Sequence, residues 1–281
     1  MFIKLLAAFI IFLVATKFIH IDIPSETADT ILAISTFTFA IYLGFAVANR
    51  NSRISVIQMS LRRNDVHLVN LYHFSKGLGE KVTRTIQKSI DRYLTRQFDY
   101  KLKDIEMTMP ELVMLRNTVI ALKPTNTKQT ELYSRMLFHI EEITLNHKEI
   151  IRNMRDTLMW YQWGVLYLLA AVIWMSLIYI NDGTTFSTIF ISFLSVAILL
   201  LILILHSLDN VTWLERVWIW KPIKELFLEL DLLPYYPESA FQERQLTKKD
   251  VADLKEYRLA RHPNKYPNME GIEVEVVRQK S

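Results

Sequence analysis

The chain has 281 residues, of which 51% are hydrophobic and 22% charged, and it contains no cysteine. The absence of cysteine excludes disulfides, thiolate metal sites and a cysteine nucleophile. The mean hydropathy of +0.16 is high for a soluble domain and indicates membrane segments, so the sequence pI of about 9.1 is better explained by basic cytoplasmic regions than by nucleic-acid binding.

Four apolar segments are long enough to cross a bilayer, which takes about 20 residues. We expect them at residues 2–20, 28–48, 158–180 and 184–206. The third and fourth contain no charged residue, and the second contains only Asp29, near its outer end. The first carries Lys4 and Lys17 near its ends. It is either a retained helix whose lysines reach the interface or a cleaved signal peptide, and we favour the retained helix.

The distribution of basic residues predicts the topology. Apart from Lys4 and Lys17, every lysine and arginine lies in residues 49–157 or 207–281. Since positive charge favours the cytoplasmic side, we expect both termini and the long middle segment in the cytoplasm. The predicted fold is an all-α membrane protein with four transmembrane helices in two hairpins. Its parts are a first hairpin (1–48), a cytoplasmic helical domain (49–157), a second hairpin (158–206) and a cytoplasmic C-terminal helix and tail (207–281).

The middle segment shows helical periodicity, for example at Ile86, Ile90 and Leu94. Thr108, Pro110 and Glu111 predict a capping box that begins a helix ending near residues 123–124. From residue 127 onward nothing in the sequence breaks a helix, so we expect one continuous helix running into the third membrane segment. Strand alternation occurs only at residues 272–277, which we interpret as a short strand or as disorder.

No motif indicates an enzyme. GxSxG, HExxH and Walker patterns are absent, and the Gly77–Gly79 pair lacks the third glycine of a phosphate-binding loop. The pairs His67/His73 and His139/His147 have no cysteine or acidic partner at a metal-site spacing, so we expect solvated or capping histidines. We therefore predict no catalytic residue, no metal and no cofactor.

One helical stripe is basic and could track phosphates; it consists of Arg84, Lys88, Arg92 and Arg96. Acidic residues interleave with it, including Asp91 and Asp99. A solvated helix face explains the stripe better than nucleic-acid binding, and contact with anionic lipid head groups stays open.

The second membrane segment carries a stripe of residues three or four apart: Thr30, Ile34, Phe37, Thr38, Ile41 and Phe45. A separate row of small residues, Ala33, Ala40, Gly44 and Ala48, would let neighbouring helices pack closely. The stripe is either an ordinary packing or lipid-facing surface, or the lining of a pore.

The run AIYLGF at residues 40–45, followed by Arg50 and Arg53, resembles the pore helix of bestrophins. Leu208-Asp209 and the run WKPIKELFLELDLLP at residues 220–234 resemble the uncharacterised bacterial bestrophin-like families. The resemblance implies a homopentameric channel for small inorganic ions in the lipid of a bacterial inner membrane. It implies a pore neck of Phe37, Ile41 and Phe45, with Thr30, Ile34 and Thr38 lining the outer pore. Calcium control is not expected, because no acidic run follows the fourth helix.

Asp22, Glu26 and Asp29 lie at the predicted outer mouth. A ring of carboxylates favours cations, whereas the positive end of the helix dipole favours anions, so we expect poor selectivity with a slight cation preference. The alternative function is a membrane-anchored helical scaffold or sensor whose cytoplasmic bundle binds a protein partner.

Overall fold

The computed structural model describes residues 25–211, 220–243, 245–247 and 249–278, together with Ile10 and Val14. Apart from these last two residues, the first predicted membrane segment lies outside the described residues, as does Asp22. The chain divides into two compact units, Met1–Ile54 with Thr157–Asn210 and Ser55–Asp156 with Val211–Ser281. We call them the first and the second unit.

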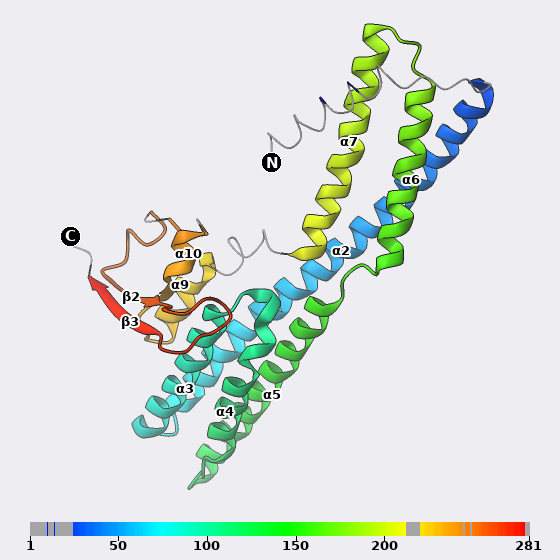
Figure 1. The fold of residues 1–281 in the computed structure, drawn as a ribbon. Helices are drawn as coiled ribbons and strands as arrows, with labels where there is room; N and C mark the ends of the chain where they lie inside the picture. Colours follow the sequence, from blue (N-terminus) through cyan, green and yellow to red (C-terminus); the bar gives the residue numbers. More distant parts are fainter. Residues whose placement is uncertain are drawn as a thin grey trace. The chain divides into compact units, whose positions relative to one another are not determined.

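The first unit is built from the beginning of α2 (Ser25–Lys76), from α6 (Trp160–Tyr179) and from α7 (Thr185–Asn210), as Figure 1 shows. All three helices are long and apolar enough to cross a membrane, which confirms the helical character of three of the four predicted spans. Their buried core includes Phe39, Leu43, Leu166, Ile173 and Leu205.

Helix α2 continues beyond the apolar segment on which it was predicted. The apolar segment ends at the polar residues after Ala48, but the helix runs without interruption through Arg50 and Arg53 to Lys76. No glycine or proline occurs between Phe45 and Lys76, and arginine is a good helix former. The change of polarity therefore alters the surroundings of the helix without ending it.

The expected continuous helix from residue 127 into the third membrane segment is wrong. Helix α5 (Thr127–Arg155) ends at Asp156, whose ψ of 85° is not helical, and α6 begins only at Trp160. The backbone N–H of Leu158 donates to Asp209 Oδ1 at 3.0 Å, and that of Met159 donates to the Gln162 side chain at 2.9 Å. These side-chain acceptors replace the backbone carbonyls of a continuous helix, and Asp209 lies 51 residues away from Leu158 in the sequence.

The second unit contains the remainder of α2 with α3 (Glu80–Asp99), the 3-10 helix η1 (Leu102–Thr108), α4 (Met109–Ile120), α5, α9 (Trp220–Glu229) and α10 (Glu238–Gln242). Ile86, Ile90 and Leu94 of α3 are buried in its core, as their spacing predicts.

The predicted capping box of α4 is wrong. Helix α4 does begin next to Pro110, but its N-cap residue Thr108 donates its hydroxyl to the Ile105 carbonyl at 2.7 Å. Glu111 instead pairs with Arg96 at 3.7 Å. Thr108 is the last residue of η1 and has helical dihedral angles (φ −93°, ψ 0°), whereas an N-cap residue is normally extended, so neither side chain of the box caps the helix.

A three-stranded sheet, which the all-α prediction omitted, lies in the C-terminal region. β1 (Tyr235–Pro237) pairs in parallel with β2 (Glu256–Arg261), and β2 pairs antiparallel with β3 (Glu273–Arg278). β3 confirms the strand predicted at residues 272–277 and excludes disorder there. β1 has only three residues, all buried, and β2 shows no alternation of burial, so neither carries the usual sequence pattern.

A chain of polar groups crosses the core of the second unit. Asn64 Nδ2 donates to the Tyr93 hydroxyl at 3.4 Å, and that hydroxyl contacts His147 Nδ1 at 3.0 Å. His147 Nε2 lies 3.4 Å from Thr108 Oγ1. His147 is fully buried, so the expectation of a solvated or capping histidine is wrong at this position. Burial lowers its pKa to about 4, which keeps the ring neutral.

Candidate functional site

The stripe on α2 lies on the side of the helix that the described part of the chain leaves uncovered. All six of its residues are exposed, whereas Phe39, Leu43 and Ala46 on the opposite side are buried against the other helices of the first unit. The three proposed neck residues, Phe37, Ile41 and Phe45, are 69%, 44% and 73% exposed. Such large apolar side chains on an exposed helix face need a lipid or protein environment, or a ring of their own kind.

The hydroxyl groups of the stripe are bonded within the helix. Thr30 Oγ1 donates to the Glu26 carbonyl at 2.9 Å, and Thr38 Oγ1 donates to the Ile34 carbonyl at 2.8 Å. Each hydroxyl oxygen keeps its lone pairs, so the N-terminal half of the stripe presents acceptors between apolar side chains. At the start of α2, Glu26 and Asp29 are also exposed.

The row of small residues on α2 is exposed as well. Ala33, Ala40, Gly44 and Ala48 are not covered by any other part of the chain that the structure describes. A Cβ atom added at Gly44 would meet no heavy atom within 4 Å. This row is therefore available for close packing with a helix other than the described ones, since small residues are common at contacts between membrane helices.

A buried carboxylate contacts α2 just beyond the C-terminal end of this stripe. Asp209, near the end of α7, accepts a hydrogen bond from Arg50 Nη1 at 3.2 Å through Oδ1. Arg53 Nη1 lies 3.7 Å from the same oxygen and donates to the Asp209 backbone carbonyl at 2.8 Å. All three side chains are less than a tenth exposed. With the Leu158 N–H, one carboxylate thus joins α2, α7 and the start of α6.

The anchoring contacts also set the orientation of the stripe. Arg50 and Arg53 occupy the buried side of α2, so their charges point away from the exposed side that carries Phe45. The sequence alone suggested that both arginines belonged to a basic cytoplasmic flank. Instead they are committed to Asp209, and the exposed face between Thr30 and Phe45 carries no charge.

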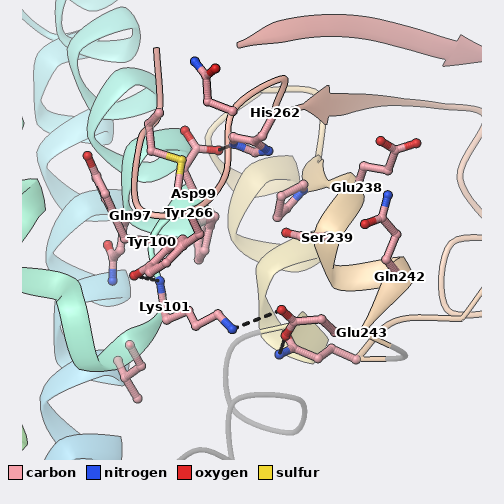
Figure 2. A pocket seen from close by; sticks show the side chains of 16 residues that line it. Gln97, Asp99, Tyr100, Lys101, Glu238, Ser239, Gln242, Glu243, His262 and Tyr266 are labelled. Carbon is pink, nitrogen blue, oxygen red and sulfur yellow. Dashed lines mark hydrogen bonds and ion pairs between the residues drawn. The ribbon is translucent and has the colours of Figure 1, made fainter. Parts of the chain in front are cut away.

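The second unit contains a polar cavity of about 250 Å³ (Figure 2). It lies between the end of α3 and α10, and Lys101, Glu243, His262 and Tyr266 are among its lining residues. Lys101 Nζ donates to Glu243 Oε1 at 3.0 Å and lies 5.6 Å from the centre of the Tyr266 ring. The charged groups on this side of the cavity thus neutralise one another.

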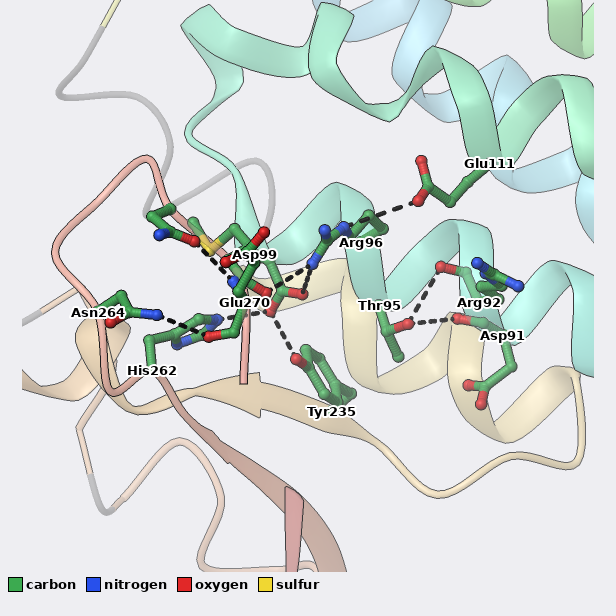
Figure 3. Close-up of polar contacts among 12 residues, drawn as sticks. Asp91, Arg92, Thr95, Arg96, Asp99, Glu111, Tyr235, His262, Asn264 and Glu270 are labelled. Carbon is green, nitrogen blue, oxygen red and sulfur yellow. Dashed lines mark hydrogen bonds and ion pairs between the residues drawn. The ribbon is translucent and has the colours of Figure 1, made fainter. Parts of the chain in front are cut away.

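Asp99 organises the polar contacts beside this cavity (Figure 3). Its Oδ1 accepts a hydrogen bond from the Tyr235 hydroxyl at 2.5 Å and lies 3.0 Å from His262 Nε2. Arg96 lies 4.0 Å from its other oxygen. Burial and the adjacent carboxylate raise the pKa of Tyr235, which therefore stays protonated as a donor. The cluster ties the sheet to α3 and is structural in character.

The remaining predicted features can be placed as well. Arg84 pairs with Glu80, and Arg96 pairs with Glu111, so the basic stripe on α3 is interrupted by carboxylates. Within the described ranges, no group of three or more histidine or acidic residues could hold a metal ion. His67 and His139, which the sequence kept apart, lie next to each other, with their Nδ1 atoms 2.8 Å apart.

Three long apolar helices, each with exposed large apolar side chains, define a multi-span membrane protein. A family model described as "Bestrophin-like domain" matches residues 3–210, and the chain therefore belongs to the bestrophin-like family. No curated protein and no solved structure matches it significantly. Membership indicates an oligomeric, channel-type membrane protein of a family that is generally associated with channels rather than with enzymes.

The main functional feature that sequence reasoning missed is the Asp209 anchor. A signal for it was present, because a lone acidic residue at the end of an apolar helix needs a partner, and two arginines follow another apolar helix. Spacing within each segment could not show that these residues, more than 150 positions apart, would meet.

Proposed function

We propose that the chain forms a homo-oligomer, a pentamer, that conducts small inorganic ions through a pore lined by α2. In this assembly Phe37, Ile41 and Phe45 from each subunit form a hydrophobic neck that gates by dewetting. Thr30, Ile34 and Thr38 line the outer part of the pore, and Glu26 and Asp29, with Asp22, surround its outer mouth.

The observation that carries the proposal is the direction of the stripe. The buried contacts of α2, including the Asp209 anchor, hold the opposite side of the helix inside the subunit. No described residue of the subunit covers the stripe, so it can face a ring of identical helices, and the adjacent small residues allow those helices to approach closely. Membership in the bestrophin-like family supports the same reading.

We propose that the first unit lies in a bacterial inner membrane. In this orientation both termini and the second unit are cytoplasmic. The cysteine-free chain allows a direct test with single cysteines and a membrane-impermeant maleimide. In intact spheroplasts, Asp182→Cys in the loop between α6 and α7 should be labelled, and Lys148→Cys on α5 should be labelled only after lysis. The reverse pattern would invert the orientation.

A membrane-anchored scaffold is the competing function, favoured by the size of the helical second unit. It predicts a monomer or dimer in detergent, whereas the channel predicts five chains of 33.1 kDa each. Native mass measurement of the purified protein separates the two before any current is recorded.

The neck is tested by conductance in planar bilayers containing a potassium salt. Phe37→Ala, Ile41→Ala and Phe45→Ala should each increase the current, because a wider and less apolar constriction is easier to wet. Phe190→Ala on α7, also an exposed apolar side chain in the first unit, is the matched control and should leave conductance unchanged. A folded pentamer that stays silent in bilayers, with or without these substitutions, contradicts the proposal.

A further inference from the structure

Two histidines face each other across the contact between α2 and α5 in the second unit. The Nδ1 atoms of His67 and His139 are 2.8 Å apart, and the ring centres are 5.1 Å apart. A hydrogen bond of this length needs one proton between the two nitrogens, so one ring donates and the other accepts. Both rings are only partly exposed.

The charged groups around the pair come from both helices. Glu142 of α5 places Oε2 at 4.0 Å from His67 Nε2, on the far side of that ring. Arg63 of α2 opposes a positive charge on His67. The His139 ring stacks on the Phe74 ring, and the ring centres are 5.4 Å apart. Arg135, which pairs with Glu131, lies 5.7 Å from the centre of the Phe74 ring.

The number of protons on the pair decides whether the contact survives. With both rings neutral, one Nδ1–H donates to the other Nδ1. A first added proton preserves the bond, because an imidazolium at His67 can still donate from Nδ1 while its Nε2–H points toward Glu142. A second proton gives two facing N–H groups and two like charges at 2.8 Å, which cannot coexist with the contact.

We propose that the His67–His139 pair is an acid-sensitive contact that holds α2 against α5 at neutral pH and releases it when both rings become protonated. Each ring has a lowered pKa, mainly because of burial, so release requires a pH below the ordinary histidine value of 6.5. Because α2 also carries the stripe, the contact would couple proton concentration to that helix. The inference itself does not depend on conduction.

His147 also titrates, but its protonation can be distinguished from that of the His67–His139 pair by pH. His147 lies in the same second unit, bonded to Tyr93, but its pKa of about 4 places its titration at lower pH. Ser60 of α2 donates to Glu149 of α5 at 2.8 Å and contributes a second contact between these helices. The test therefore uses a pH range of about 7.5 to 5 and a readout confined to residues near the pair. Asp65 of α2 has a pKa of about 7 and titrates in the same range, but its protonation favours the fold and occurs equally in the His139 variants, so the comparison with those variants isolates the pair.

The experiment measures amide hydrogen exchange of the full-length protein in detergent, corrected for intrinsic pH dependence. In the native protein, protection of peptides around residues 63–70 and 136–143 should fall at least tenfold between neutral and acidic buffer. His139→Gln should abolish this acid response, since the amide oxygen can accept from His67 Nδ1–H in every protonation state. His139→Leu should reduce protection at both pH values, because it offers no partner.

His73→Gln changes an exposed histidine of α2 that lies six residues, less than two helical turns, beyond His67. It is the matched control and should respond to acid like the native protein. An unchanged acid response in His139→Gln, or an absent response in the native protein, overturns the proposal. Either result is independent of whether the protein conducts ions.

Discussion

At the level of single residues, Asp209 joins three helices of the first unit. It interacts with Arg50 and Arg53 and accepts the Leu158 N–H, and all of these contacts are buried. Burying an ion pair contributes little by itself, but removing one partner leaves charge without compensation. The anchor is therefore sensitive to any change that removes its charge.

Asp209→Asn should lower the free energy of unfolding by about 3–5 kcal/mol, because two buried guanidinium groups lose their carboxylate. The amide oxygen of the asparagine can still accept a hydrogen bond from the Leu158 N–H. The loss of stability therefore measures the missing charge and not the missing hydrogen bond. Denaturant titration in detergent measures it. Asp29→Asn, at an exposed carboxylate of the same unit, should change the value by less than about 0.5 kcal/mol. Equal effects at both positions would exclude an anchoring role.

Asp65 gives the second unit a pH dependence of its own. Burial, with a smaller contribution from Glu229, raises its pKa to about 7. Because the folded-state pKa lies above the unfolded value, the protonated carboxyl is compatible with the fold, and stability is lost as the pH rises through about 7.

Asp65→Asn should therefore stabilise the protein at about pH 8, by on the order of 2 kcal/mol, and have little effect at about pH 4. Unfolding followed by tryptophan fluorescence at both pH values measures the difference. Glu141→Gln, an exposed change on α5, should show no such pH dependence. A stabilisation of equal size at both pH values would show that burial does not perturb Asp65.

At the scale of elements, sequence periodicity located the helices well and their connections poorly. The apolar spans and the amphipathic α3 follow from patterns within one segment. The break between α5 and α6 depends on Asp209, and the pairing of β1 with β2 joins Tyr235 to Arg258. Such long-range contacts leave no periodic signal in either segment.

For the candidate site, too, the sequence predicted the features that depend on one segment and not those that depend on distant residues. The spacing of Phe37, Ile41 and Phe45 placed them on one side of a helix, and the structure leaves that side exposed. The spacing could not indicate what holds the opposite side, which depends on residues of α6 and α7.

The turn between α2 and α3 depends on Gly79, whose φ of 107° lies in a region that other residues rarely adopt. Gly79→Ala should destabilise the protein by about 1–2 kcal/mol through backbone strain. The melting temperature measured in detergent should fall accordingly. Gly164→Ala is the control, because that glycine is helical and a Cβ there meets no atom within 4 Å. A decrease for Gly164→Ala of the same size would point to a general effect of added methyl groups.

At the scale of the whole molecule, the proposed pore has acidic residues only at its outer end. Glu26 and Asp29 are exposed at the start of α2, and the exposed stripe that follows is uncharged. In an oligomer these carboxylates are repeated around the mouth, where they attract cations within a screening length of about 8 Å in physiological salt.

The double variant Glu26→Gln/Asp29→Asn should shift the reversal potential in a salt gradient toward that of anions, with a smaller shift at high salt. Bilayer recordings measure the shift, with Glu141→Gln as a control far along the sequence in the second unit. An unchanged reversal potential in the double variant would place the selectivity elsewhere.

The Asp209 contacts also impose an order on biosynthesis. Arg50 leaves the ribosome 159 residues before its carboxylate partner, a delay of roughly ten to thirty seconds at ordinary translation rates. During that interval the N-terminal spans are already made while both guanidinium groups still lack their acceptor. A nascent chain that stalls before codon 209 would consequently carry both arginines without the Asp209 carboxylate.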